Sequence, residues 1–145
     1  MGNTTKEKID ERKIKILNTA FDIFVEKTIE AVSMGEIAKA AGVGRATLFR
    51  YYPSKLELVI EVCGKKWKDV FDELDRCRPI SSVGEISALD RLIFTLDSYI
   101  ALYQNYKELL CYNDNFNHYV SRVGEDNERL AAFHESLYSV NVRLH

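Results

Sequence analysis

Proline and glycine are scarce in this sequence, with two and seven copies respectively among 145 residues. Sustained alternation of apolar and polar residues is also missing, which argues against β-strands with one buried and one exposed face. Apolar residues instead recur at the three- and four-residue spacing of amphipathic helices. With 46% hydrophobic residues, the chain can bury a substantial core. These features predict an all-α protein.

The sequence also lacks the markers of a secreted, membrane-bound or metal-dependent protein. No apolar run is long enough to cross a bilayer and no secretory signal is present, so we expect a cytoplasmic location. The cysteines are odd in number and include no CxxC pair, which excludes a disulfide framework or a zinc site. We therefore expect no metal or cofactor, and we expect buried, apolar cysteines at three positions: Cys63, Cys77 and Cys111.

Recognisable catalytic motifs are absent as well. The sequence contains neither a GxxxxGK[ST] phosphate loop nor an HExxH metal motif. Gly42-Val43-Gly44 lacks the third glycine and the preceding strand of a dinucleotide-binding loop. Asp114, His118 and Glu125 could be combined into an acid/base set, but scattered surface groups explain them better. We predict that the protein is not an enzyme.

The charge is unevenly divided along the chain, although the net charge is only −2. Residues 1–67 contain 12 Lys and Arg against 9 Asp and Glu, whereas residues 68–145 contain 8 against 13. A basic first half followed by an acidic second half is typical of a DNA-binding head on a body with another task.

Residues 33–55 contain the local signals of a helix-turn-helix. Ser33 and Glu36 have the spacing of a capping box, in which each side chain accepts a hydrogen bond from a first-turn N–H. Gly42 stands where a helix ends in the left-handed conformation. Pro53 is expected in the first turn of the next helix, because it lacks the N–H that a helix interior requires. The short helix between these two positions is small-faced and tipped with arginine, so it can enter the major groove of DNA.

Further helices are expected on both sides of this motif. We divide the chain into a DNA-binding domain of residues 1–55 and a helical domain of residues 56–145, joined by a long helix. In the helix expected over residues 84–104, five residues should face inward: Ile86, Leu89, Ile93, Leu96 and Ile100. The expected helices outside the motif cover residues 8–27, 53–76, 84–104, 106–123 (as one helix or two) and 125–144.

The ordered segments EIAKAAGV, TLFRYY and PSK resemble the DNA-binding head of the TetR/AcrR family of bacterial transcriptional regulators. The resemblance covers roughly residues 10–67. It implies a regulator, most often a repressor, that binds a palindromic operator in double-stranded DNA as a homodimer. Such regulators usually bind a small effector in the second domain, and they are usually longer than this chain. We therefore expect the helical domain to be incomplete.

Four residues at the start of the recognition helix are the candidate base readers. Arg45 can bond to guanine O6 and N7, and the Thr47 methyl group can touch a thymine. Gly44 and Ala46 lack bulk, so the backbone can approach the groove closely.

Four further residues are candidate phosphate contacts. Arg50 and Tyr51 lie further along the same helix. The family resemblance also implies phosphate contacts for Tyr51 and for Lys55. Ser33 stands at a helix N-terminus, where N–H groups favour an anion. The alternative for Arg50 is a solvated surface charge, and the alternative for Tyr51 is a position in the core. Tyr52 is expected in the core.

The sequence leaves two interpretations open for each of two groups of residues. A cluster of basic residues near the N-terminus can be a solvated face or attract DNA phosphate: Lys6, Lys8, Arg12, Lys13 and Lys15. Aromatic residues in the second half can be core or can line a pocket for a small, largely apolar effector: Phe94, Tyr99, Tyr103, Tyr112, Phe116 and Tyr119. The alternative function is a similar DNA-binding architectural or cell-cycle factor without an effector.

Overall fold

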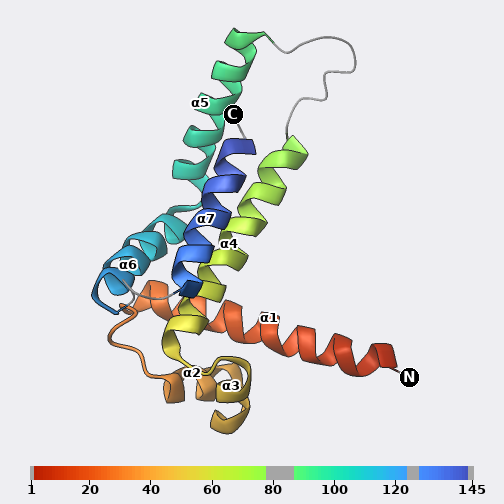
Figure 1. Cartoon of the computed structure of the whole chain (residues 1–145), viewed down its shortest axis with the longest axis vertical. Helices are drawn as coiled ribbons and strands as arrows, with labels where there is room; N and C mark the ends of the chain where they lie inside the picture. Colours follow the sequence, from red (N-terminus) through yellow and green to blue (C-terminus); the bar gives the residue numbers. More distant parts are fainter. Residues whose placement is uncertain (1, 78–86, 124–127, 144–145) are drawn as a thin grey trace.

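The computed structural model describes residues 2–77, 87–123 and 128–143, and within these ranges it contains seven α-helices and no strand (Figure 1). This confirms the predicted all-α class. A long α1 leads into the short pair α2 and α3, and the remaining helices form the body. The helices are α1 (Gly2–Glu26), α2 (Met34–Ala41), α3 (Arg45–Tyr51), α4 (Lys55–Cys77), α5 (Ala88–Asn105), α6 (Lys107–Val123) and α7 (Glu128–Arg143).

Serine side chains define where two of the body helices begin. The Ser54 hydroxyl accepts a hydrogen bond from the Glu57 N–H at 3.2 Å, so α4 begins at Lys55 and the predicted start at Pro53 is wrong by two residues. The Ser87 hydroxyl likewise accepts from the Asp90 N–H at 3.1 Å at the start of α5.

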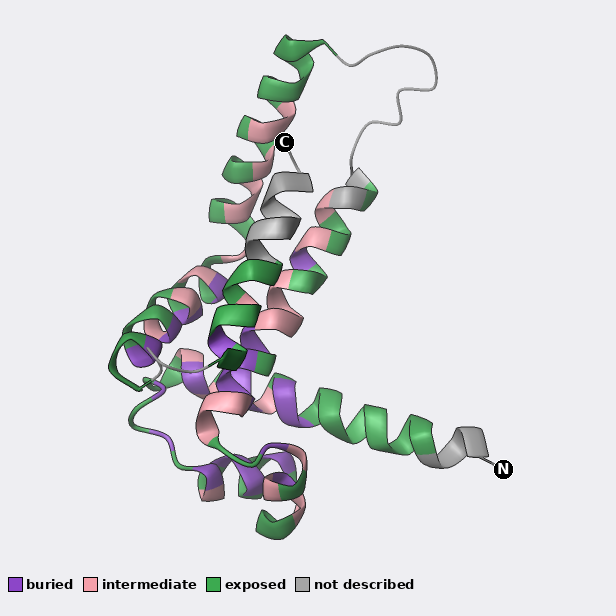
Figure 2. Ribbon diagram, in the orientation of Figure 1, coloured by how far each residue is buried: buried purple, intermediate pink, exposed green. Residues whose placement is uncertain are grey.

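A single core unites the head with the body. In Figure 2, buried segments gather where α1, α4 and α6 meet, and again within α2 and α3. Tyr112 on α6 is fully buried, with its ring centroid 5.4 Å from that of Phe21 and 6.2 Å from that of Phe24, both on α1. Its hydroxyl donates a hydrogen bond to the Val59 carbonyl oxygen of α4 at 2.8 Å. The body therefore packs on α1 and α4, the helices that precede and follow the α2–α3 pair.

The first half of α1 projects beyond this core. Side chains of residues 6–15 are all exposed, and burial begins at Ile16. The helix also starts at Gly2, earlier than the predicted residue 8. The N-terminal turns of α1 are therefore a charged, solvated helix beside the head (Figures 1 and 2).

The predicted inward face of α5 is exposed instead. Leu89, Ile93, Leu96 and Ile100 have exposed fractions of 64, 48, 53 and 54%, while Ile86 lies outside the described residues. Among the described helices, α5 packs mainly on α6, which leaves this face uncovered.

The aromatic and polar segment after α5 forms one helix. Asn113 and Asn115 do not break α6, because both amides are engaged. Trp67 Nε1 donates to Asn113 Oδ1 at 3.2 Å, and Asn115 Nδ2 donates to the Cys111 carbonyl oxygen at 3.1 Å. Cys63 is buried as predicted, but Cys111 is exposed, since α6 turns other residues to the core.

Candidate DNA interface

The N-terminus of α2 is closed by the predicted capping box. Ser33 Oγ accepts from the Glu36 N–H at 3.2 Å, and Glu36 Oε2 accepts from the Ser33 N–H at 2.7 Å. The hydrogen bond from the Ser33 backbone is the main reason that the pKa of Glu36 lies below its usual value. Lys27 Nζ lies 3.8 Å from Glu36 Oε1. Ser33 itself is exposed and therefore accessible to DNA. Its role as a phosphate contact stays a prediction.

The turn between α2 and α3 depends on Gly42. Its φ of 67° is the left-handed conformation predicted at this position. The Gly42 N–H donates to the Lys39 carbonyl oxygen at 3.2 Å, and the Val43 N–H donates to that of Ala38 at 3.0 Å. These bonds end α2 and set the angle at which α3 leaves.

Three of the four predicted base readers at the start of the recognition helix α3 are exposed: Gly44, Arg45 and Ala46. Gly44 caps the helix with extended backbone angles, and its carbonyl oxygen accepts from the Leu48 N–H at 3.0 Å. Leu48 is fully buried and anchors the helix. The fourth predicted base reader, Thr47, is half-buried.

The C-terminal turn of α3 carries aromatic and cationic groups together. Tyr51 is half-buried, and its ring lies beneath two cations: Arg50 Cζ is 5.5 Å and Lys13 Nζ is 5.8 Å from the ring centroid. Tyr52 is buried, as expected, and burial raises its pKa to about 12. Adjacent tyrosines therefore take different positions, with Tyr52 in the core and Tyr51 at its edge.

Lys55, the predicted phosphate contact at the start of α4, is half-buried and already has protein neighbours. Its Nζ donates to the Glu30 carbonyl oxygen at 3.3 Å and lies 5.6 Å from the Tyr119 ring centroid of α6. Burial lowers the pKa of this ammonium group. Lys55 thus touches the head, the connecting helix and the body at once.

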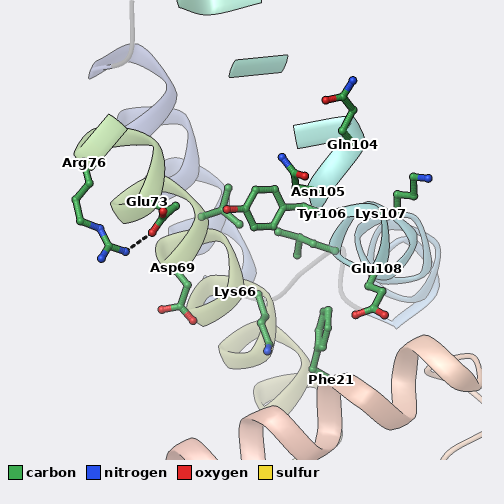
Figure 3. A pocket seen from close by; sticks show the side chains of 12 residues that line it. Phe21, Lys66, Asp69, Glu73, Arg76, Gln104, Asn105, Tyr106, Lys107 and Glu108 are labelled. Atoms are coloured by element: carbon green, nitrogen blue, oxygen red, sulfur yellow. Dashed lines mark hydrogen bonds and ion pairs between the residues drawn. The ribbon is translucent and has the colours of Figure 1, made fainter. Parts of the chain in front are cut away.

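A cavity of about 640 Å³ lies between α4 and the junction of α5 and α6 (Figure 3). Phe21 and Tyr106 contribute aromatic rings to its lining, and charged side chains from α4 and α6 surround them. Lys66 Nζ lies 4.3 Å from the Phe21 ring centroid. The remaining lining residues are Asp69, Val70, Glu73, Arg76, Gln104, Asn105, Lys107, Glu108 and Leu109.

None of the six aromatic residues predicted to line an effector pocket lines this cavity. Tyr112, Phe116 and Tyr119 are buried in the core. Tyr99 and Tyr103 are exposed on α5, by 50 and 65%, and Phe94 is half-buried on the same helix. Their roles toward an effector stay predictions. Lys66 and Tyr106 were missed, because helical periodicity does not show which helices enclose a space.

Comparisons with known proteins point to one family. The family model described as "Bacterial regulatory proteins, tetR family" matches residues 16–62, from the buried half of α1 into α4. HTH-type transcriptional regulator AcrR of Shigella flexneri is 36% identical over 62 residues, which cover 43% of this chain and 29% of that protein. HTH-type transcriptional repressor KstR of Mycolicibacterium smegmatis is 35% identical over 66 residues, covering 46% and 32%. A crystal structure described as a TetR-family regulator from Mesorhizobium loti has a TM-score of 0.68 at 19% identity, covering 90% of this chain and 60% of that one.

The fold and the interface together define an all-α protein with a helix-turn-helix DNA-binding head. Over residues 16–62, the chain is similar to regulators of the TetR family. The relatives that match this segment are named as transcriptional regulators and repressors. The matched segments span about a third of the length of these curated relatives.

Two general findings concern the described residues alone. Within them, no group of three or more His, Cys, Asp or Glu side chains could hold a metal ion. No helix of these ranges is both long and apolar enough to cross a membrane.

Proposed function

We propose that the protein is a transcriptional repressor that binds a palindromic operator as a homodimer in the bacterial cytoplasm, and that a small effector releases it. The observation that carries the proposal is the geometry of α3. Its buried Leu48 and the Gly42 turn fix the helix, while Arg45 and Ala46 remain exposed at its N-terminal end. This is the end of a recognition helix that meets base edges in the major groove.

The base readers and phosphate contacts divide along the head. Arg45 and Thr47 read bases, and Gly44 and Ala46 allow the backbone to come close. Phosphate contacts come from four side chains around the recognition helix: Ser33, Arg50, Tyr51 and Lys55.

The effector is a small, largely apolar molecule that binds in the body. The cavity beside α4 supports this site, because Phe21 and Tyr106 offer it an aromatic wall. Charged groups such as Lys66 and Glu108 at the same cavity can hold a polar end of the molecule.

Contacts between the body and the first turns of α4 give the effector a route to the head. Tyr112 of α6 bonds to the Val59 carbonyl oxygen, and Arg129 of α7 lies 2.9 Å from Glu57 and 3.3 Å from Glu61. An effector that shifts α4 against α6 and α7 also shifts Lys55 and α3. A coupling of about 1–3 kcal/mol changes operator occupancy 5–150-fold.

The exposed face of α5 supports association of two copies. Seven large side chains fall within an arc of about 120° on this helix, at 100° per residue. Each is roughly half exposed or more, and together they approach the ~800 Å² that one partner contributes to a standard interface. The residues of this apolar stripe are Leu89, Leu92, Ile93, Leu96, Tyr99, Ile100 and Tyr103.

Selection of bound sequences from a pool of random duplex DNA tests the proposed function. We expect enrichment of a palindrome with half-sites about one helical turn, ~34 Å, apart. Arg45→Ala should relax preference at one base position per half-site, by about 1–3 kcal/mol. Arg122→Ala on α6 is the control and should leave the profile unchanged. A pool without any enriched sequence would overturn the proposed function.

The effector part has a separate test. An apolar ligand panel is screened for compounds that raise the melting temperature and also release the operator, because ligand binding to the folded state stabilises it. Release without stabilisation, or stabilisation without release, would contradict the proposed coupling. In that case the protein binds DNA without an effector.

A further inference from the structure

Two cations from different helices meet at one aromatic ring of the head. Lys13 on α1 places its Nζ 5.8 Å from the Tyr51 ring centroid, and Arg50 on α3 places its Cζ 5.5 Å from the same centroid. Both cations are exposed, whereas the ring is half-buried. The ring therefore fixes the place where α1 and α3 bring positive charge together.

Within the described part of the chain, this positive charge is not paired with a carboxylate. The ion pairs among the described residues include neither Lys13 nor Arg50. An anion beside the Tyr51 hydroxyl is attracted by both cations, and the hydroxyl can donate a hydrogen bond to it.

We propose that Lys13, Arg50 and Tyr51 form one binding site for a backbone phosphate of the operator, so that α1 contributes directly to the DNA interface. The inference rests on the proposed function, because Arg50 and Tyr51 belong to the recognition helix. A phosphodiester suits the site, since it carries a single negative charge and several acceptor oxygens. The site adds one phosphate contact to those predicted from the helix-turn-helix alone.

The same geometry separates Lys13 from the other basic residues of α1. Lys8 is five residues earlier, which places it about 140° around the helix from Lys13. The Lys15 ammonium lies toward the turn, 3.6 Å from the position that a Cβ on Gly42 would occupy. Among the described residues of this basic cluster, Lys13 is the one whose ammonium lies over a ring of α3.

The salt dependence of operator binding tests the assignment. Each phosphate contact contributes about 0.9 to the slope of log K against log salt concentration. Because a homodimer carries two such sites, Lys13→Ala should reduce the slope by about 1.8, and it should weaken binding about 30-fold at 0.15 M salt, for specific and random DNA alike. Lys13→Arg should retain the wild-type slope, because it retains the charge.

Lys8→Ala is the matched control, with the same loss of charge on the same exposed helix. It should keep the wild-type slope, and both alanine variants should melt like the wild type because both side chains are exposed. An unchanged slope for Lys13→Ala, or an equal fall for Lys8→Ala, would overturn the inference while the proposed function stands. A wild-type protein that binds no DNA would overturn both.

Discussion

The hydrogen bond from the Tyr112 hydroxyl joins α6 to α4, and its removal tests how much this contact contributes to stability. The side chain is fully buried, and its hydroxyl donates to the Val59 carbonyl oxygen at 2.8 Å. Tyr112→Phe keeps the ring against Phe21 and Phe24 and removes only the donor. The Val59 carbonyl lies within α4 and remains an acceptor of the helix, so no buried group is left without a partner. We expect a loss of about 1 kcal/mol in the free energy of unfolding, and a fall of about 4 °C in melting temperature.

Urea unfolding followed by circular dichroism measures this loss, with Tyr103→Phe as the control. Tyr103 is 65% exposed on α5, so removal of its hydroxyl should leave stability unchanged. Equal stability of the two variants would refute the reasoning, because the buried hydrogen bond would then contribute nothing. A loss above about 3 kcal/mol would also refute it, since that exceeds the effect of one neutral hydrogen bond. If Tyr112 lines an effector site instead, the change appears in operator release at unaltered stability.

Three further predictions concern the turn, the core and the apolar stripe. Gly42→Ala should destabilise the protein by about 1–2 kcal/mol in urea unfolding because φ is 67°, whereas Gly35→Ala inside α2 should stabilise it by roughly 0.5–1 kcal/mol. Burial raises the pKa of Cys63 from 9.0 to about 12, so its contribution to stability is complete below pH 9 and is lost as the pH rises to about 12. In unfolding experiments across this range, Cys63→Ala should lose less stability than the wild type; an identical slope would contradict the assignment. Leu96→Glu on α5 should convert dimer to monomer in light scattering, and an unchanged mass would exclude the stripe as the interface.

The features predicted correctly depend on residues close together in the sequence. The capping box involves Ser33 and Glu36, and the left-handed turn depends on Gly42 alone. Even these local signals compete with one another. Pro53 and Ser54 both suit a helix start, and the structure shows that the serine cap wins, because its hydroxyl accepts from the Glu57 N–H.

The errors arise where a prediction needs knowledge of what lies opposite. Helical spacing correctly grouped Leu89, Ile93, Leu96 and Ile100 on one face of α5. Spacing could not show whether another helix covers that face, and the described helices do not. Cys111 illustrates the same limit, since cysteine is usually buried but α6 turns Tyr112 and Phe116 inward instead.

The position of Lys55 shows why the candidate site needed the structure as well as the motif. Resemblance assigned Lys55 to phosphate, and nothing in its spacing connects it with Glu30 or Tyr119. The fold brings all three together, with Lys55 Nζ bonded to the Glu30 carbonyl oxygen and beside the Tyr119 ring. Because Tyr119 belongs to α6, any movement of the body against α4 changes the surroundings of this ammonium group. The ammonium group has three N–H donors, so Lys55 can bind the proposed phosphate and keep its bond to the Glu30 carbonyl oxygen, which holds the group in place for that contact.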